Sequence, residues 1–304
     1  MISWKQVIRV ELLPYLKVTF SVVVWGASFI ATKIALRDIQ PITVVWVRFV
    51  IGVIILGIVV LIRKQFKLPQ IAEIPYFGVL GFLGITLHQW LQSTGLVTSK
   101  ASTTAWIVAT TPVFIAIISW FYLKEKLKWA QVLGIGLATI GVLLVISEGD
   151  ISSLFVGDFG NFGDILIFIS AINWAVFSVI SRRGLKDHPA ALMMFYVMSA
   201  GWLMISIPFF VGPGVNDLQA LSLYSFLGVL FLGIFCSGIA YTFWYDALKS
   251  IPASQVGVFL YLEPFIAVIV AAFILGESII LASLIGGLLI LFGVWMVNRL
   301  SASE

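Results

Sequence analysis

The chain has little charge and few side chains that form disulfides or metal sites. Only 11% of its 304 residues are charged, whereas a soluble domain has about 25%. Its one cysteine, Cys236, excludes an internal disulfide and a cysteine-based metal site, and two histidines are too few for a histidine cluster. No GxxxxGK[ST] stretch encodes an ATP-binding loop. We therefore expect no metal, no cofactor and no nucleotide-driven activity.

Long apolar runs dominate instead, and hydrophobic residues make up 61% of the chain. A helix needs roughly 20 apolar residues to cross a bilayer, and no run alternates in the way that barrel strands do. The sequence predicts an all-α membrane protein with ten transmembrane helices, at Tyr15–Leu36, Ile42–Ile62, Ile74–Thr94, Ser102–Leu123, Trp129–Ser147, Phe162–Ser181, Pro189–Val211, Leu223–Trp244, Ala253–Leu275 and Ile279–Val297.

Positive charge is divided unequally between the two sides of this ten-span arrangement. One side carries clusters such as Lys124, Lys126 and Lys128, whereas the other carries only Lys33, Arg37 and Lys100. Because lysine and arginine favour cytoplasmic loops, we expect both termini to be cytoplasmic. The first 14 residues have no apolar core and no cleavage site follows them, so the first span is expected to be retained. The small net charge of +4 indicates no nucleic-acid partner.

The second half of the chain repeats the first at a distance of 152 residues. Residues of the same type recur at Leu96, Ala101, Ser102, Pro112, Ile117, Phe121, Leu123, Glu125, Ala130, Gly134, Leu137, Gly141, Val142 and Val145. We predict a five-helix repeat at 15–147, an outer midpoint loop at 148–161 and a second five-helix repeat at 162–299. An odd number of spans inverts the second repeat, which is typical of transporters with a substrate site near the midplane. A duplicated structural bundle without transport is the alternative.

Several segments also carry a family resemblance: WGASFIATKIAL, VRFVIG, LHQWLQSTGLVTSKASTTAWIVATTPVFIAIISWFYLKEKL, YDALKSIPASQVGVFLYLEPFIAVIVAAFILGES and GGLLILFGVWMV. They resemble the EamA domains of the drug/metabolite transporter superfamily over nearly the whole chain. The resemblance implies a multi-pass permease of the bacterial plasma membrane, often an exporter of amino acids, metabolites or drugs.

We accordingly expect a non-enzymatic secondary transporter that exports a small organic solute by alternating access. The partners expected are that solute and the lipid bilayer. Coupling to protons and a homodimer are both compatible with the sequence. An importer or facilitator of the same solutes, and a non-transporting structural or sensory protein, are the alternatives.

Glu263 stands in the middle of an apolar stretch, and an ionisable residue within a membrane span indicates a functional site. It is a candidate proton carrier or partner of a cationic substrate. Thr111 occupies the corresponding place in the first repeat. The alternative is a static contact between helices, which the resemblance favours because a Glu-Pro pair is common at this place in the family.

Arg48 is a candidate for binding a substrate carboxylate through paired hydrogen bonds. The alternative is an arginine whose charge reaches the membrane surface, or one that is ion-paired within the protein. Further candidates for lining the cavity are polar or aromatic and lie deep in their spans: Trp25, His88, Gln89, Trp106, Asn173, Trp174, Tyr241 and Tyr261. Core packing is the alternative for each of these.

Pro112 and Pro264 are hinge candidates, because a proline interrupts helical hydrogen bonding. The carbonyls of Val108 and Leu260 would then be free to face a cavity. We expect Glu125 and Glu277 each to cap the helix that follows it. The small faces at Gly134, Ala138 and Gly141, and at Gly286 and Gly293, predict close helix contacts in a scaffold or a dimer.

Overall fold

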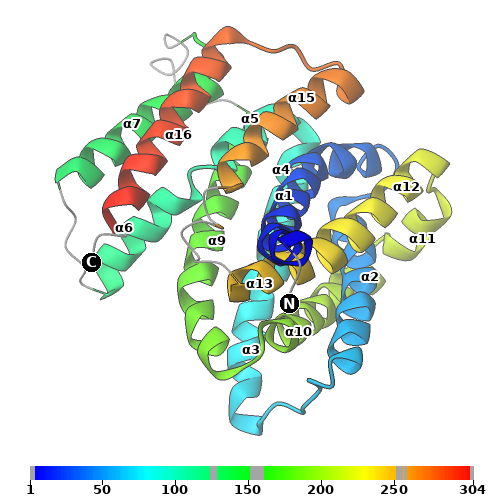
Figure 1. Cartoon of the computed structure of the whole chain (residues 1–304). Helices are drawn as coiled ribbons and strands as arrows, with labels where there is room; N and C mark the ends of the chain where they lie inside the picture. Colours follow the sequence, from blue (N-terminus) through cyan, green and yellow to red (C-terminus); the bar gives the residue numbers. More distant parts are fainter. Residues whose placement is uncertain (1–3, 124–128, 151–160, 251–255, 257–258, 302–304) are drawn as a thin grey trace.

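The computed structural model describes residues 4–123, 129–150, 161–250, 256 and 259–301, and every regular element in those ranges is a helix (Figure 1). The helices are α1 (Trp4–Ala35), α2 (Pro41–Ile62), η1 (Ile71–Glu73), α3 (Ile74–Gly81), η2 (Phe82–Leu87), α4 (His88–Thr98), α5 (Ala101–Val108), α6 (Thr111–Leu123), α7 (Trp129–Ile146), α9 (Phe162–Asp187), α10 (Ala190–Val211), α11 (Gly214–Gln219), α12 (Leu223–Phe231), η3 (Leu232–Ile239), α13 (Ala240–Ser250), η4 (Leu260–Leu262), α15 (Glu263–Leu275) and α16 (Leu281–Ser301).

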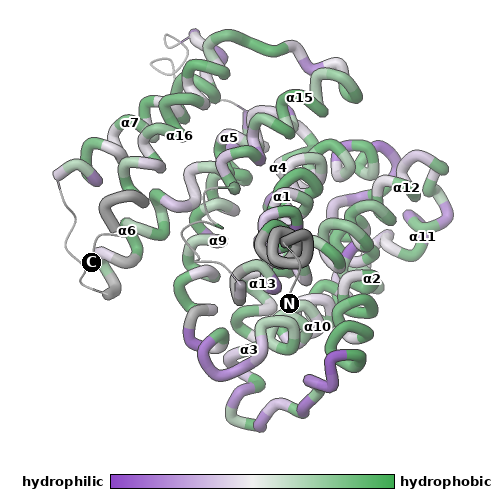
Figure 2. Tube along the Cα trace, viewed as in Figure 1, coloured by the Kyte–Doolittle hydropathy of each residue, from purple (hydrophilic) through white to green (hydrophobic). Residues whose placement is uncertain are grey.

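Eight stretches of these helices are long and apolar enough to cross a membrane. They match the first eight predicted spans, so that part of the prediction is confirmed. The last two apolar helices, Leu260–Leu275 and Leu281–Val297, are shorter within the described residues. Many large apolar side chains remain exposed, among them Ile62, Leu203 and Phe273. Hydrophilic residues gather at the helix ends and connections, as Figure 2 shows. The chain is a multi-pass membrane protein whose outward apolar side chains face lipid.

The third and eighth spans are not uniform α-helices. Each contains a π-helical segment, η2 in the third span and η3 in the eighth. Such segments are rare and often occur at functional sites, because the extra residue changes which side chains face inward. The sequence analysis missed both. The tetrapeptide FLGI, which occurs at 82–85 and again at 231–234, is the signal that links them.

The predicted proline interruptions are present in the fourth and ninth spans. In the fourth, α5 ends at Val108 and α6 begins at Thr111, so Pro112 lies in the first turn of a new helix. In the ninth, η4 precedes α15, where Pro264 lies in the first turn. The expected free carbonyls are not free: Val108 accepts the Thr111 hydroxyl at 2.7 Å, and Leu260 accepts the backbone N–H of Glu263.

The small faces of α7 and α16 pack directly against each other. A Cβ atom on Gly134 would lie 2.7 Å from the Gly293 carbonyl oxygen, and one on Gly286 would lie 2.7 Å from that of Gly141. Only glycine allows the two backbones this close. The contact lies within one chain, and Figure 1 shows the two helices side by side.

The remaining spans pack in a pattern that matches between the halves. Helix α1 lies against α13 and α15, whereas α9 lies against α4 and α6. Helices α2 and α10 contact each other, and each contacts a π-helical segment of the other half of the chain, η3 and η2 respectively. The largest apolar core lies among these elements and includes Phe49, Phe177, Met198 and Tyr241.

Candidate functional site

Arg48 of α2 is buried, with 5% of its surface exposed. Its Nε donates to the Ser237 hydroxyl in η3 at 2.8 Å, and its Nη1 donates to the Gln89 side-chain oxygen in α4 at 3.0 Å. Both acceptors are neutral. Among the described residues, no carboxylate lies within ion-pair distance of the guanidinium. A buried cation without an anion is costly, so this position calls for an explanation.

His88 begins α4, directly after the π-helical segment η2. Its Nδ1 lies 3.1 Å from the Ser170 carbonyl of α9, and because a carbonyl only accepts, this nitrogen carries the proton. The imidazole lies 4.7 Å from the Trp174 ring. Asn173 donates to the carbonyl of Leu83 at 2.6 Å, within η2. The third span and α9 are therefore joined by polar and aromatic contacts at the same depth.

Trp25 of α1 makes the corresponding contacts with the eighth span. Its indole N–H donates to the Cys236 carbonyl in η3 at 3.1 Å. Its ring lies 5.5 Å from Tyr241 in an edge-on arrangement and 5.1 Å from Trp244. Gln89, which Arg48 contacts, directly follows His88, and Tyr241 belongs to the same apolar core as Phe49, which follows Arg48. We define the Arg48 cluster as these neighbouring residues: Trp25, Arg48, His88, Gln89, Trp174, Ser237 and Tyr241.

Glu263 lies at the border of this cluster, at the first residue of α15. Its backbone carbonyl packs against Gly26 of α1, where a Cβ atom would come within 2.8 Å. Its side chain is partly buried, and no hydrogen bond or ion pair to its carboxylate is present among the described residues. Gly26 directly follows Trp25 of the Arg48 cluster, so this contact places Glu263 beside the cluster. Among the described residues, this region thus contains one cation and one carboxylate that lack an ionic partner.

Two of the predicted cavity residues lie elsewhere. Trp106 is buried against α16, where a Cβ atom on Gly287 would meet its indole at 2.6 Å, and it contacts Phe265 at 5.4 Å. Tyr261 packs against the apolar core that contains Trp106. The other predicted residues, Trp25, Arg48, His88, Gln89, Asn173, Trp174, Tyr241 and Glu263, lie in or beside the Arg48 cluster.

Glu277 makes a contact that the sequence analysis placed wrongly. Its carboxylate accepts the backbone N–H groups of Ala101 and Ser102, at 2.8 and 3.1 Å, and the Ser102 hydroxyl at 2.6 Å. It therefore caps α5, which belongs to the other half of the chain, and not the helix that follows it. Free N–H groups and the helix dipole make a helix start favourable for a carboxylate. Glu125 lies outside the described residues, so its helix cap stays a prediction.

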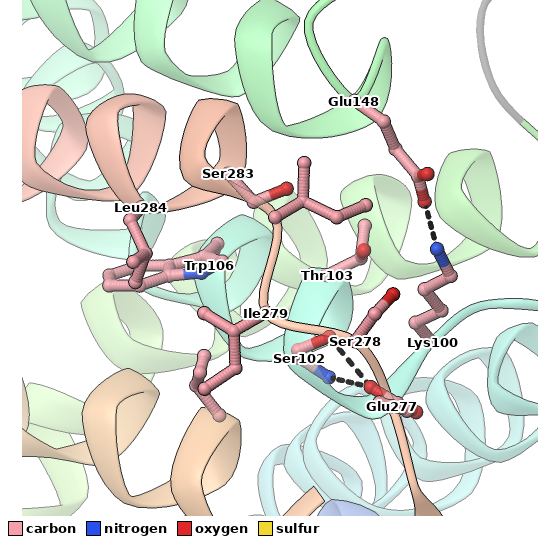
Figure 3. A pocket seen from close by; sticks show the side chains of 12 residues that line it. Lys100, Ser102, Thr103, Trp106, Glu148, Glu277, Ser278, Ile279, Ser283 and Leu284 are labelled. Atoms are coloured by element: carbon pink, nitrogen blue, oxygen red, sulfur yellow. Dashed lines mark hydrogen bonds and ion pairs between the residues drawn. The ribbon is translucent and has the colours of Figure 1, made fainter. Parts of the chain in front are cut away.

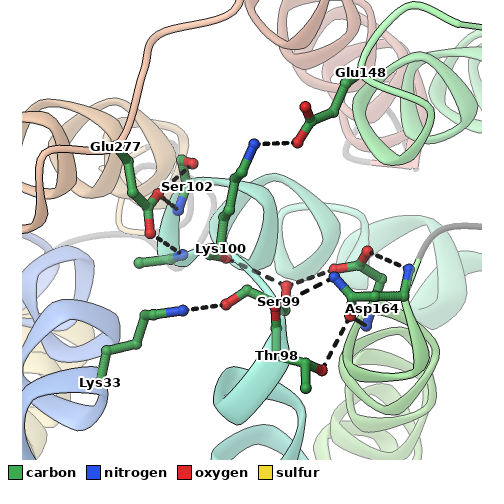
Figure 4. Close-up of polar contacts among 10 residues, drawn as sticks. Lys33, Thr98, Ser99, Lys100, Ser102, Glu148, Asp164 and Glu277 are labelled. Carbon is green, nitrogen blue, oxygen red and sulfur yellow. Dashed lines mark hydrogen bonds and ion pairs between the residues drawn. The ribbon is translucent and has the colours of Figure 1, made fainter. Parts of the chain in front are cut away.

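Other polar contacts surround this cap (Figure 4). Lys33 of α1 donates to the Ser99 carbonyl at 2.5 Å, and the Ser99 hydroxyl donates to Asp164 of α9 at 2.5 Å. Lys100 forms an ion pair with Glu148, after α7. A pocket of about 10 Å³ lies beside them, bordered by Ser102, Trp106 and Ser283 (Figure 3). We call these contacts the Glu277 network: Lys33, Ser99, Lys100, Ser102, Glu148, Asp164 and Glu277.

A second network lies on α1 toward its N-terminus, at Lys17. Asp246 of α13 accepts two hydrogen bonds from Arg63, at 2.7 and 2.9 Å, and one from Lys17 of α1 at 2.8 Å. We call these three residues the Asp246 network. Lys17 and Lys33 lie on the same helix with Trp25 halfway between them. At a rise of 1.5 Å per residue, each lies about 12 Å along the axis from Trp25. The Arg48 cluster therefore lies midway between the two networks.

Loop contacts add to these ties at the helix ends. Glu73 lies 2.9 Å from His188, which joins the starts of α3 and α10. Asp38 accepts the backbone N–H of Ser222 at 2.9 Å, and hydrogen bonding by Ser222 holds the pKa of the Asp38 carboxyl below its ordinary value. The sequence analysis missed these acidic partners because each lies far along the chain from the residue it contacts.

A larger pocket of about 340 Å³ lies between α6, α7 and α9. Its lining is mostly apolar, with Val113, Ile135 and Phe168 among the lining residues, and Asp164 is its one ionisable residue. Neither of these two pockets is bordered by Arg48, Trp25 or Tyr241.

Comparison with known proteins gives consistent results. The model of the EamA-like transporter family matches the chain twice, at residues 12–147 and 161–299. An uncharacterized transporter of Archaeoglobus fulgidus is 27% identical over 284 residues, covering 93% of this chain and 96% of that protein. The uncharacterized transporter YyaM of Bacillus subtilis is 29% identical, covering 88% of each chain. A crystal structure shares the fold at 20% identity, with a TM-score of 0.63 and coverage of 95% and 97%.

Proposed function

Because this chain belongs to the EamA-like transporter family, we propose that it is a secondary transporter that exports a small organic solute by alternating access. The observation that carries the proposal is the Arg48 cluster, in which buried polar and aromatic side chains of several spans meet midway between two polar networks. Transport sites are expected near the bilayer midplane, where the repeats meet. We propose no enzymatic activity.

The two halves are proposed to be inverted repeats, at 15–147 and 162–299, joined by an outer loop at 148–161. The glycine contacts of α7 and α16 support this. Gly134 corresponds to Gly286 in the repeat, and Gly141 to Gly293, yet each glycine contacts the counterpart of the other. A two-fold relation produces such reciprocal contacts. The corresponding π-helical segments in the third and eighth spans support the same symmetry.

The orientation that fits the lysine and arginine distribution places both termini in the cytoplasm of a bacterial plasma membrane. The Glu277 network then lies at the outer face, and the Asp246 network lies at the cytoplasmic face. We propose that these networks are the two closures of alternating access. Breaking one while the other holds would open the Arg48 cluster to one side at a time.

Glu263 is proposed to carry a proton in exchange for the solute, because it is an unpaired carboxylate beside the cluster. Two alternatives differ from this proton-coupled exporter. A facilitator would move the solute without using a proton gradient, and an importer would move it in the opposite direction. A homodimer remains a prediction. The small faces of α7 and α16, which could have formed a dimer contact, already contact each other within one chain, so the described residues indicate no dimer surface.

The test is a metabolite and toxin-resistance screen on cells that lack or overexpress the protein, followed by flux in proteoliposomes. Export predicts that overexpression lowers the intracellular level of a solute, and that deletion raises it. The reverse changes would indicate an importer. A screen and flux assays that detect no solute movement would favour a structural or sensory protein and reject the proposal.

A further inference from the structure

Arg48 combines deep burial with incomplete hydrogen bonding. Its Nε and one Nη1 hydrogen are used by Ser237 and Gln89. A guanidinium has five N–H hydrogens, so three of them, including both on Nη2, have no hydrogen-bond partner among the described residues. The two bonds that exist hold the group in one orientation from two different spans. The hydrogens left for a ligand are therefore the two on Nη2 and the second one on Nη1.

The positive charge of Arg48 also has no ionic partner among the described residues. The two acceptors that hold it are a hydroxyl and an amide, and neither carries a negative charge. Removing an ion from water costs several kcal/mol unless an opposite charge or further hydrogen bonds compensate. Arg63, in contrast, is ion-paired with the Asp246 carboxylate through two hydrogen bonds at 2.7 and 2.9 Å. The same chain therefore pairs one arginine at a membrane face and leaves another unpaired at the centre.

Aromatic side chains lie near Arg48. The guanidinium lies 5.3 Å from the Phe49 ring, and Trp25, Trp174 and Tyr241 belong to the same cluster. A solute with an apolar or aromatic body would find matching surface there. Glu263, at the border, would repel an anion placed near it, so an anionic group is directed to Arg48.

From these contacts we infer that the transported solute carries a carboxylate, which binds end-on to Nη1 and Nη2 of Arg48 and replaces the missing counter-ion. Planar guanidinium and carboxylate groups form two parallel hydrogen bonds, a geometry that a lysine cannot copy. The apolar body of the solute would contact Trp25, Trp174 and Tyr241. This inference rests on the proposed transport function and adds the chemical class of its substrate.

The closing experiment identifies the solutes that the protein moves, without assuming any of them. Proteoliposomes are loaded with a bacterial metabolite extract, and mass spectrometry compares the solutes that leave them with those that leave protein-free liposomes. We expect the solutes released by the protein to carry a carboxylate. Release of only neutral or purely cationic solutes overturns the inference but leaves the transport function standing. If the protein causes no release of any solute, the proposed transport function is overturned, and the inference with it.

Variants then test the residue. For a released carboxylate, Arg48→Gln should raise KM about 30-fold or more, since loss of one partner of a buried charge pair costs 2–5 kcal/mol. Arg48→Lys should restore part of this loss. Arg37→Gln, which removes an exposed cation outside the helices, is the matched control and should leave KM unchanged. An unchanged KM in a folded Arg48→Gln protein rejects the role of Arg48. If that variant does not fold, Ser237→Ala, which frees the guanidinium, should still raise KM.

Discussion

Glu277, two residues after the end of α15, binds the first turn of α5 through both the backbone N–H and the hydroxyl of Ser102, at 3.1 and 2.6 Å. The two residues are far apart in the sequence and belong to different halves of the chain. A single carboxylate thus fastens the start of the fourth span to the connection between the ninth and tenth. We interpret this contact as the main element of the outer closure.

Replacing Glu277 by alanine should weaken that closure. Loss of a helix cap costs about 0.5–2 kcal/mol, which shifts a two-state equilibrium by roughly 2- to 30-fold. The single cysteine, Cys236, lies buried in η3 next to Ser237 of the Arg48 cluster and serves as a native probe. A membrane-impermeant maleimide added outside intact cells should label Cys236 faster in Glu277→Ala. Ser102→Ala, which keeps the two N–H bonds, should give an intermediate rate, and Cys236→Ser gives the background. Equal rates in Glu277→Ala and wild type would argue against an outer closure here.

The Asp246 network should act in the same way from the cytoplasmic face. Asp246→Asn removes the shared partner of Lys17 and Arg63 and leaves two cations close together. We expect faster labelling of Cys236 in inside-out vesicles and no increase from the outside. Lys17→Gln and Arg63→Gln each remove one ion pair, so each should have a smaller effect than Asp246→Asn. Faster labelling from outside in Asp246→Asn would contradict the assignment of this network to the inner face.

The contact between α7 and α16 predicts a strict requirement for glycine. Gly134→Ala places a Cβ atom 2.7 Å from the Gly293 carbonyl oxygen, and such overpacking costs about 1–3 kcal/mol. Gly136, on the same helix, has no atom within 4 Å of its added Cβ. Gly136→Ala should therefore be neutral or stabilise by up to about 1 kcal/mol, since alanine favours helix. Thermal unfolding in detergent measures both, and equal melting temperatures for the two variants would disprove the packing.

Proton coupling makes Glu263 the residue to test with a pH gradient. In proteoliposomes, an acidic outer compartment should increase export by the wild type, because protons entering down their gradient drive the solute out. Glu263→Gln mimics the protonated carboxyl permanently and should abolish the response to the gradient while leaving the fold intact. Asp187→Asn, which neutralises an exposed acid at the end of α9, is the control. A gradient response that persists in Glu263→Gln assigns the coupling elsewhere.

Topology is tested with introduced cysteines in a Cys236→Ser background. Gln219 in α11 and Lys67 after α2 are both exposed, and the proposed orientation places them on opposite sides of the membrane. Gln219→Cys should react with an impermeant reagent on intact cells, whereas Lys67→Cys should react only after the membrane is permeabilised. The reverse pattern would show that the termini lie outside.

Much of the fold followed from the sequence. Membrane helices satisfy their backbone hydrogen bonds within each segment, so hydrophobicity and length were sufficient to locate eight spans. Pro112 and Pro264 marked helix interruptions because proline cannot continue the hydrogen-bond pattern. The small faces at Gly134 and Gly293 correctly indicated a close helix contact. Glu277 was correctly expected to cap a helix, but the helix was the wrong one, since a local pattern carries no information about a distant partner.

The sequence by itself determined an all-helical membrane protein with two related halves, since hydrophobic length and internal repetition are properties of the chain alone. Only the tertiary structure decided which deep polar residues meet. It separated Trp106 and Tyr261 from the Arg48 cluster, paired His88 with Trp174 and Trp25 with Tyr241, and left Arg48 without an anion. Those relations depend on helix rotation and on the π-helical segments, which are set by packing between spans and not by the periodicity of any single one.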